Sequence, residues 1–558
     1  MSDKVNISHW LKKSCARHPY KRAVVYPSSR DGHGRVLYSQ LTFAQLDAES
    51  DFLAHGLKTA GIKRGLRTIL MVPPGMEFFC LIFAMFKVGA VPVVVDPGMG
   101  INRMLSCFRH TSPQAFIGIE KAHILRIMRP ATFKPVHTFI TVGRRWFWGG
   151  YTLDDLRKVT TEPFEPADTS SGETAAILFT TGSTGPAKGV VYTHGNFDAQ
   201  IRMIQEHFNI QEDEIDLPTF PLFALFDPAL GMTAVIPDMD PTRPAFVNPE
   251  RIIEAIENHG VTNMFASPAL LNRVGKYGRE LDLRLPSLRR VVSAGAPVSP
   301  ANIEQFSIML NSDAEIHTPY GATEAVPVLS ISSNEILSET RKLSEQGFGI
   351  CVGRPICGTE VELIKINEEH IGTWSHDILV PDKDVGEITV KSPLVTESYF
   401  QNPKADLFSK ITDDRGGVWH RMGDLGWRDT KGRIWFCGRK SHRVITAGGT
   451  LFTIPCEAIF NNHNLVSRSA LVGIGNPGRE IPVICIEPVP GVKNKKDLIA
   501  EMHGVAASHP LTQDIEHILI HKSFPVDIRH NSKIFREILA DWASKKLKNK
   551  LTDLDISE

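Results

Sequence analysis

The chain has 558 residues, of which 42% are hydrophobic, and this is enough apolar material for about two to four domains with their own cores. Its 62 lysine and arginine residues are balanced by 62 aspartate and glutamate residues. Because this balance leaves no overall positive charge, the composition disfavours nucleic acid and anionic membranes as partners. Any recognition of phosphate must be local, and we expect the partner to be a small molecule.

The 8 cysteines are scattered and form no CxxC pair, which disfavours a zinc ribbon and a dense disulfide framework. The amino-terminal segment MSDKVNISHWLKKSCARHP lacks the uninterrupted apolar core of a secretion signal. No stretch reaches the roughly 18 to 20 apolar residues that are needed to span a bilayer. We therefore expect reduced thiols and a cytoplasmic protein with no integral membrane segment.

The chain up to about residue 350 alternates helical patterns with short β-branched runs, which is typical of α/β domains. Its most apolar window, 78–95, predicts a buried helix followed by the core strand AVPVVVD. In RRVVSAGAP, 289–297, a strand ends in a small-residue turn, as strands at nucleotide sites of parallel sheets tend to do. The other elements expected here are a helix over 43–61, strands over 68–72, 91–95 and 116–119, a helix over 252–260 and a strand over 262–267.

After about residue 350 the pattern changes to β-rich segments such as EVELIKI, VGEITVKS and RIWFCGRK. From about residue 442 a further unit mixes strands with helices and has the size of an independent fold. We therefore predict an α/β multidomain protein, with two layered α/β subdomains and a β-rich subdomain followed by a small mobile α+β domain. The predicted boundaries are 1–438 for the large N-terminal domain and 439–558 for the small C-terminal domain.

Residues 177–189, ILFTTGSTGPAKG, place a strand before a loop of small hydroxylated residues and glycines that ends at a lysine. Glycines allow a close approach to the backbone, and hydroxyl and amide groups can donate to phosphate oxygens. The loop therefore predicts a phosphate site rather than an ordinary turn. It is not a Walker A loop, because Ala187 and Gly189 stand at two of the four fixed positions of that motif. The phosphate-binding candidates are Thr180, Thr181, Gly182, Ser183, Thr184, Gly185 and the mobile cation Lys188.

Two loops can supply the rest of a nucleotide site, although each alone is also typical of a plain turn. In TPYGATEA, 318–325, Tyr320 offers an aromatic face for a base, Thr323 a phosphate donor and Glu324 a carboxylate for Mg²⁺. In SAGAP, 293–297, the small residues let a flat ring lie against the backbone. Together these loops predict the binding of a nucleotide with its metal ion.

Two later segments add charged candidates. In HRMGDLGW, 420–427, Asp424 follows a short β run and can accept hydrogen bonds from two ribose hydroxyls, the alternative being an exposed turn aspartate. The segment GRK, 438–440, is followed by RHNSKIFR, 529–536, in which Lys533 stands in a polar loop before a helix. A lysine in such a loop is usually solvated surface. The combination of segments, rather than any one of them, indicates function.

These segments occur in the order and at the spacing of the adenylate-forming superfamily. Over nearly its whole length the chain resembles acyl-CoA synthetases, luciferases and peptide-synthetase adenylation domains. Within that superfamily it looks most like the β-lactone synthetases of bacterial long-chain olefin biosynthesis. That closer likeness rests on LPTFPLFALFDPALG (217–231), VIPDMDPTRPA (235–245), HRMGDLGW (420–427), FCGRKSHRV (436–444) and PVDIRHNSKIFRE (525–537).

The resemblance implies that ATP and Mg²⁺ bind to the large N-terminal domain, as an AMP-binding adenylation domain. Lys533 of the mobile domain would be the adenylation lysine, bridging the substrate carboxylate and the α-phosphate when that domain closes. The catalytic candidates are Lys533, Glu324, Thr184 and Lys188. The residues implied to contact the β and γ phosphates are Thr180, Ser183, Thr184 and Lys188. The adenine would lie along Gly295, Ala296 and Pro297, with Tyr320 stacked on it and Gly321 in the same loop. The remaining implied contacts are Thr323 on the α-phosphate, Glu324 on Mg²⁺, Asp424 on the ribose, and Arg439 on the ribose and phosphates.

The sequence departs from typical acyl-CoA ligases at the hinge and at the acyl gate. At the hinge, Ser441 replaces an aspartate and Ile445 replaces a lysine. The residue before the adenylation lysine is Ser532 instead of glycine, and the aromatic-histidine step of the gate reads Phe223 and Ala224. These changes weigh against CoA as an acceptor and fit an enzyme that needs no external thiol.

A 3-hydroxy acid carries its own acceptor, because intramolecular attack by the hydroxyl on the activated carbonyl gains a large effective concentration. We therefore expect ATP-dependent activation of a 2-alkyl-3-hydroxy fatty acid and its closure to a β-lactone, with AMP and diphosphate as the other products. His194, His420 and His442 are the candidates for the proton acceptor. The alternatives are a long-chain fatty acyl-CoA or acyl-AMP ligase and a catalytically silent scaffold. The likeness also implies contact with other olefin-biosynthesis enzymes.

Overall fold

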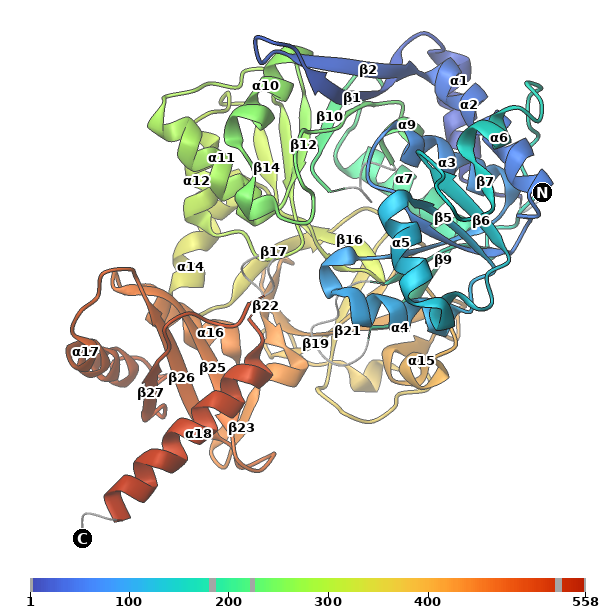
Figure 1. The fold of residues 1–558 in the computed structure, drawn as a ribbon. Coiled ribbons are helices and arrows are strands. Elements are labelled where there is room, and N and C mark those ends of the chain that lie inside the picture. The colour runs from blue at the N-terminus through green and yellow to red at the C-terminus, as the bar shows by residue number, and fades with distance from the viewer. Residues whose placement is uncertain (1–3, 180–186, 221–225, 527–533, 556–558) are drawn as a thin grey trace.

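The computed structural model describes residues 4–179, 187–220, 226–526 and 534–555. In that part of the chain, three large sheets form the main body, and a three-stranded sheet belongs to a C-terminal unit that lies to one side, drawn in red in Figure 1. Two of the large sheets are mainly parallel and carry helices, and the third is antiparallel. This is the α/β multidomain architecture that the sequence predicts.

The first sheet is parallel except for its last pair of strands. Helix α3 (Met76–Val88) is buried from Phe78 to its end and packs against α2 (Phe43–Thr59). The helix buries one charge, Lys87, whose Nζ lies 2.6 Å from a carboxylate oxygen of Asp47 and of Asp51. This pairing offsets the cost of burying the ammonium group. The strands in spatial order are β7 (Tyr151–Thr152), β6 (Thr138–Val142), β5 (Ala115–Ile119), β3 (Arg67–Met71), β4 (Val91–Val95), β8 (Thr174–Phe179) and β9 (Gly189–Thr193).

The second sheet is parallel except at one edge. There, the two strands that come first in the chain pair antiparallel to each other. Its helices α10 (Pro249–His259) and α11 (Pro268–Glu280) begin with proline after a capping residue, Asn248 or Ser267, whose side chain accepts a backbone N–H of the first turn. The strands in spatial order are β14 (Glu315–His317), β13 (Arg290–Ser293), β12 (Asn263–Ala266), β10 (Ile215–Pro218), β11 (Thr233–Val235), β1 (Arg22–Arg30) and β2 (Val36–Thr42).

The third sheet is antiparallel and begins with a hairpin that carries residues 320–325. Within its first strand, a Cβ added to Gly321 would lie 2.6 Å from the carbonyl oxygen of Ala325, so only glycine fits. The strands in spatial order are β15 (Tyr320–Ala322), β16 (Ala325–Ser330), β17 (Ile350–Pro355), β22 (Ile434–Arg439), β21 (Val418–Arg428), β19 (Gly386–Lys391) and β18 (Glu360–Ile364), with β20 (Lys410–Thr412) paired to β21.

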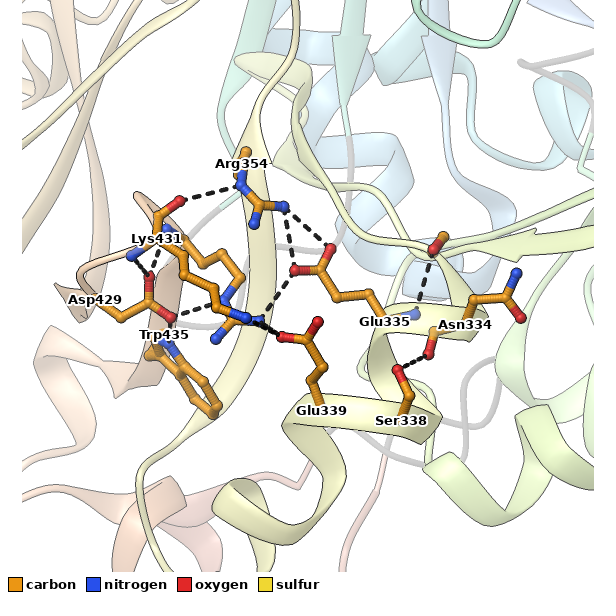
Figure 2. Close-up of polar contacts among 10 residues, drawn as sticks. Asn334, Glu335, Ser338, Glu339, Arg354, Asp429, Lys431 and Trp435 are labelled. Carbon is orange, nitrogen blue, oxygen red and sulfur yellow. Dashed lines mark hydrogen bonds and ion pairs between the residues drawn. The ribbon is translucent and has the colours of Figure 1, made fainter.

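A partly buried ion-pair cluster joins strands of the third sheet to the helical connection between β16 and β17, which carries Glu335 and Glu339 (Figure 2). Arg433 is 5% exposed and donates to Asp429, 2.7 Å away, in the turn before β22. The same guanidinium donates to Glu335 and Glu339, at 3.0 Å and 2.9 Å. Arg354 of β17 also pairs with Glu335. Because several carboxylates share two guanidinium groups, the cluster holds this connection against the third sheet more firmly than isolated surface pairs would.

The C-terminal unit packs on the outer end of the third sheet through α16 (Thr453–Asn461), which contacts β22. Asn462 also donates to the carbonyl oxygen of Glu345, 2.7 Å away. The sheet of this unit has its own apolar core between helices. Its elements are β25 (Val466–Ile474), β26 (Ile481–Pro488), β27 (His517–Ile520), α17 (Lys495–Ala507) and α18 (Arg536–Asp555).

The helices and strands expected in the first part of the chain are confirmed to within three residues at each end. One placement was wrong: Asp424 lies inside the long strand β21, at 4% exposure, and not in a turn after a strand. No helix in the described part of the chain is long and apolar enough to cross a membrane.

Candidate active site

A cavity of about 530 Å³ is lined by residues from all three large sheets. The carboxyl ends of parallel strands supply part of the wall, through Thr219 after β10, Ser267 after β12 and Gly295 after β13. This is where α/β sheets usually bind ligands. One end of the cavity is apolar and the other polar, so a molecule with a hydrocarbon part and a charged part would fit it lengthwise.

The apolar end lies between α3 of the first sheet and α7 (His194–His207). Phe78, Ile82 and Phe86 of α3 face Phe197 and Ile204 of α7 across it. The rings of Phe86 and Phe197 contact each other at 6.0 Å between centroids. Side chains of this kind favour alkyl groups over water, by about 0.8 kcal/mol for each buried methylene.

Asp424, Tyr320 and Arg439 form one cluster, which reaches the polar end of the cavity through Arg439. The strands β21 and β22 pair Asp424 with Arg439, and the Nε of Arg439 lies 3.1 Å from Oδ1 of Asp424. The hydroxyl of Tyr320 donates to Oδ2 of Asp424 at 2.5 Å. Burial and the neighbouring carboxylate raise the pKa of Tyr320, so the phenol keeps its proton and its role as a donor. The sequence predicted these three residues as parts of one site, and the structure brings them together.

Glu324 lies in a second cluster at the polar end. Its Oε1 accepts a hydrogen bond from the hydroxyl of Tyr399 at 2.6 Å. The ammonium groups of Lys188 and Lys410 lie 4.8 Å and 5.8 Å from the centre of the Tyr399 ring. Burial lowers the pKa of Lys410 to about 8, against the opposing effect of Glu324. Two cations and one carboxylate thus meet at the tyrosine, which is an arrangement suited to anions together with a metal ion.

Sequence reasoning missed Tyr399 and Lys410. Each is a single residue in a segment without a motif, and Tyr399 lies 75 positions from the carboxylate that it contacts. The only available signal was the proximity of Tyr399 to the start of the helix α15 (Pro403–Ser409), which Asn402 caps. A tyrosine before a helix is too common to indicate a site.

Several predicted site residues lie outside the described part of the chain. Within the loop predicted to bind phosphate, the described residues include the exposed Lys188, which lines the cavity, and Gly189, which begins β9. In the adenine segment, Gly295 lines the cavity with a φ of 94°, and Ala296 and Pro297 follow it. Thr323 and Gly321 also line the cavity. The predictions for Thr180, Thr181, Gly182, Ser183, Thr184, Gly185 and Lys533 fall on residues that the structure does not describe.

The three candidate histidines have different surroundings. His194 lies in the core, where its Nδ1 accepts the backbone N–H of Ile7 at 3.3 Å. His442 lies 3.5 Å from a carboxylate oxygen of Glu537, at the junction with the C-terminal unit. Of the three, His420 is the one that lines the cavity. Its Nδ1 lies 3.1 Å from the carbonyl oxygen of Ser409, which can only accept, so this nitrogen carries the proton and Nε2 is left as the basic atom.

The charge state of His420 follows from its surroundings. Burial and, after it, the positive charge of Lys410 lower the pKa of His420 well below its usual range. Lys188 and Arg439 act in the same direction. The imidazole is therefore neutral at physiological pH, and it would become more basic when anions enter the cavity and offset these cations.

Replacing Tyr399 by phenylalanine should weaken Mg²⁺ binding or activity while leaving the packing of the ring unchanged. The change removes the donor that orients the Glu324 carboxylate, and the loss of such a supporting bond typically costs about 10- to 100-fold in metal affinity or activity. The check is the Mg²⁺ concentration that gives half-maximal activity. Tyr277→Phe is the matched control, since it removes a 2.9 Å bond to Glu250 far from the cavity. Equal behaviour of the two variants would contradict the assignment of Tyr399.

The chain matches the family model described as AMP-binding enzyme over residues 11–400. Among curated proteins it is similar to the olefin β-lactone synthetase of Xanthomonas campestris pv. campestris, with 46% identity over 98% of this chain and 99% of the relative. The olefin β-lactone synthetase of Stenotrophomonas maltophilia is 45% identical over 99% of this chain and 100% of the relative.

Solved structures show the same fold. The anthranilate CoA ligase AuaEII in complex with anthranoyl-AMP superposes with a TM-score of 0.78 at 18% identity, covering 98% of this chain and 99% of that chain. The o-succinylbenzoate CoA synthetase of Bacillus subtilis in complex with ATP and magnesium superposes with a TM-score of 0.73 at 20% identity, covering 95% of this chain and 98% of that chain. The chain belongs to the AMP-binding enzymes of the adenylate-forming superfamily, where it groups with the olefin β-lactone synthetases.

Proposed function

We propose that the protein is an ATP-dependent β-lactone synthetase that acts on 2-alkyl-3-hydroxy fatty acids in olefin biosynthesis. The observation that carries the proposal is one cavity that is lined both by apolar side chains of α3 and α7 and by Glu324, Lys188 and Arg439, in a chain 46% identical to an olefin β-lactone synthetase. The apolar end takes the alkyl groups, and the polar end takes the nucleotide and the reacting carboxylate.

ATP is held at the polar end in this proposal. Asp424 accepts hydrogen bonds from the ribose hydroxyls, beside Arg439, and Tyr320 lies against the adenine with Gly295 on the opposite side. Lys188 and the loop before it contact the β and γ phosphates. Lys410, which the sequence did not predict, adds a second positive charge beside Lys188 for these phosphates.

The residues at the polar end fit Mg²⁺. Mg²⁺ is usually bound by one or two carboxylates together with substrate phosphates and water, rather than by a cage of protein ligands. Glu324 is one such carboxylate, and the described residues contain no cluster of three or more metal-ligating side chains. When bound, Mg²⁺ would neutralise the charge that develops on the phosphates.

In the first step, a carboxylate oxygen of the acid attacks the α-phosphorus of ATP. The bond from that phosphorus to the bridging oxygen breaks, and diphosphate leaves with the bonding electrons. Like charges oppose this attack, so the cations Lys188 and Lys533 act where negative charge collects. The walls of α3 and α7 keep water away from the acyl-adenylate.

In the second step, the 3-hydroxyl oxygen attacks the acyl carbon of the same molecule. The bond from this carbon to the phosphate oxygen breaks, AMP leaves, and a four-membered lactone forms. The hydroxyl proton passes to Nε2 of His420, the ring nitrogen that carries no proton. Ser441, at the hinge position where CoA ligases carry aspartate, lines the cavity as well. No thiol takes part in this sequence of bond changes.

Mass spectrometry of the products, with and without CoA, tests the proposal. Purified protein with ATP, Mg²⁺ and a 2-alkyl-3-hydroxy acid should form lactone and AMP at the same rate in both samples. Acyl-CoA formation would select the ligase alternative, and the absence of diphosphate release would select the silent scaffold. We also expect contact with other olefin-biosynthesis enzymes, and a pull-down from the native host that finds none would count against it.

Replacing His420 by glutamine should separate the two steps. Glutamine keeps the polarity but cannot accept the proton, and loss of a general base typically costs about 100- to 10,000-fold. We expect lactone formation to fall by that amount, while acid-dependent exchange of diphosphate into ATP continues. The check is the ratio of lactone to hydrolysed acid in the products. An equal loss of exchange and of lactone would assign His420 to the nucleotide instead.

A further inference from the structure

A second, small cavity of about 70 Å³ continues the apolar end on the side of the second sheet. Phe208, Ile210, Leu230 and Met232 line it and do not line the main cavity. The side chains of α3 line only the main cavity. The apolar end therefore has two branches, one along α3 and one toward the second sheet. The residues that line both cavities are Ile204, Phe226, Phe265, Ala294, Pro319 and Val326.

Three polar residues, Asp216, Asp227 and Asn263, line the small cavity among apolar side chains. Asp216 of β10 and Asp227 of α9 (Phe226–Ala229) are both buried, and their side chains share a hydrogen bond. Asp216 also accepts a hydrogen bond from the side chain of Asn263. Among the described residues, none donates to Oδ2 of Asp227. A buried carboxyl oxygen without a donor beside an apolar cavity is unusual, since such groups are costly to bury.

Burial favours the protonated form of the pair. The guanidinium of Arg290 opposes this effect at Asp216, but it is itself paired with Glu214 at 2.7 Å and lies 3.3 Å from the side-chain oxygen of Asn263. Burial raises the pKa of Asp216 to about 7, and burial together with Asp216 raises that of Asp227 well above its usual range. The two groups share a proton, as neighbouring buried carboxyls do. The wall is thus polar but does not carry two full charges.

A 2-alkyl-3-hydroxy acid needs two such branches. Its alkyl arms leave adjacent carbon atoms next to the carboxylate, so both must diverge from one point at the apolar end. We propose, as a consequence of the proposed function, that the small cavity takes the end of one arm and that the Asp216–Asp227 pair sets the length limit of that arm. Both residues form part of the wall of this cavity, so an arm that reached them could not lengthen further without displacing buried, closely packed groups.

The length limit can be measured with two series of acids, in which one arm is lengthened by single methylenes while the other stays short. The readout is acid-dependent diphosphate release, expressed as kcat/KM relative to the shortest acid of the series within each variant. This ratio cancels differences in the active fraction of each preparation. Each methylene that enters apolar space should raise kcat/KM about fourfold, and the rise should stop in one series where the arm meets the carboxyl pair.

Variants of Asp227 test the role of the pair. Asp227→Ala removes the carboxyl group. In that series, kcat/KM should then keep rising for at least one further methylene, and the acid with that methylene should gain about fourfold in relative kcat/KM. Asp227→Asn keeps the volume and a polar end, and should leave the stop where it is in the wild type. A profile unchanged by Asp227→Ala in both series would overturn the proposal.

A matched pair of filling variants tests the two branches. Leu230→Phe narrows the small cavity and should lower the maximum arm length in the same series. Ile82→Phe narrows the branch along α3 and should lower the maximum arm length only in the other series. Equal effects of the two variants on both series would overturn the assignment of the branches. Wild-type diphosphate release with branched acids but without lactone would contradict the proposed function alone, because this readout does not require ring closure.

Discussion

Replacing Lys533 by alanine should lower acid-dependent diphosphate release by about 100- to 1,000-fold, the usual cost of removing one well-placed electrostatic donor. The lysine is assigned by the position of its motif in the sequence, and the reason for the effect is charge. A carboxylate that approaches the α-phosphate of ATP meets like charge, and an ammonium group placed between them lowers the barrier. The measurement is the rate of diphosphate release at saturating ATP and acid.

The control for this change is Lys545→Ala on α18, an exposed lysine of the same C-terminal unit. It removes the same charge from the same unit and should leave the rate unchanged. Thermal unfolding should give the same midpoint for both variants and the wild type. If Lys533→Ala retained more than about a tenth of the wild-type rate, the adenylation lysine would have to be another residue.

Replacing Glu324 by glutamine should have an effect of similar size, about 100-fold or more, through the metal ion. Glutamine keeps the shape and the hydrogen bond to Tyr399 but removes the negative charge that attracts Mg²⁺. The deficit should shrink as Mg²⁺ is raised, because mass action then replaces part of the lost affinity. The measurement is a titration of activity with Mg²⁺ at fixed ATP.

Glu360→Gln provides the comparison for this variant, since Glu360 is an exposed carboxylate of β18 on the same sheet. Its Mg²⁺ titration should overlay that of the wild type. A Glu324→Gln enzyme with a normal Mg²⁺ requirement would show that another group holds the metal. A normal Mg²⁺ requirement combined with a raised KM for ATP would show that Glu324 contacts the nucleotide and not the metal ion.

The fold could be predicted from local patterns to a large extent. Within 43–61, 68–72 and 91–95, the spacing of apolar residues indicates whether an element is buried on one face or on both. This spacing depends only on residues that are close in the sequence. The position of Asp424 was harder to predict, because glycines near an aspartate are typical of a turn as well as of some strands. The segment is extended because β21 pairs with β22 on one side, where Asp424 lies opposite Arg439, and with β19 on the other.

The site was predictable where function is concentrated in motifs. Tyr320, Asp424 and Arg439 were found because each lies in a distinctive segment, and the structure joins them by hydrogen bonds and an ion pair. Tyr399 and Lys410 could not be found, because their roles depend on contacts across the third sheet and not on their neighbours in the sequence.

Long-range packing also decides among residues of one type. His194, His420 and His442 were equivalent in the sequence, and only the tertiary structure places one of them at the cavity. The carboxyl pair of Asp216 and Asp227 is a similar case. An aspartate in a strand and an aspartate before a proline each suggest an exposed group, and their burial against each other follows from the position of α9 on the second sheet.

The most direct test of the account follows oxygen atoms from an acid that carries ¹⁸O in both carboxyl positions. Attack of the carboxylate on the α-phosphorus transfers one labelled oxygen to AMP and leaves the other in the lactone carbonyl, while the ring oxygen comes from the unlabelled 3-hydroxyl. We therefore predict one ¹⁸O in AMP and one in the lactone for each turnover. Unlabelled AMP together with a doubly labelled lactone would mean that the hydroxyl is activated instead of the acid, and it would contradict the account.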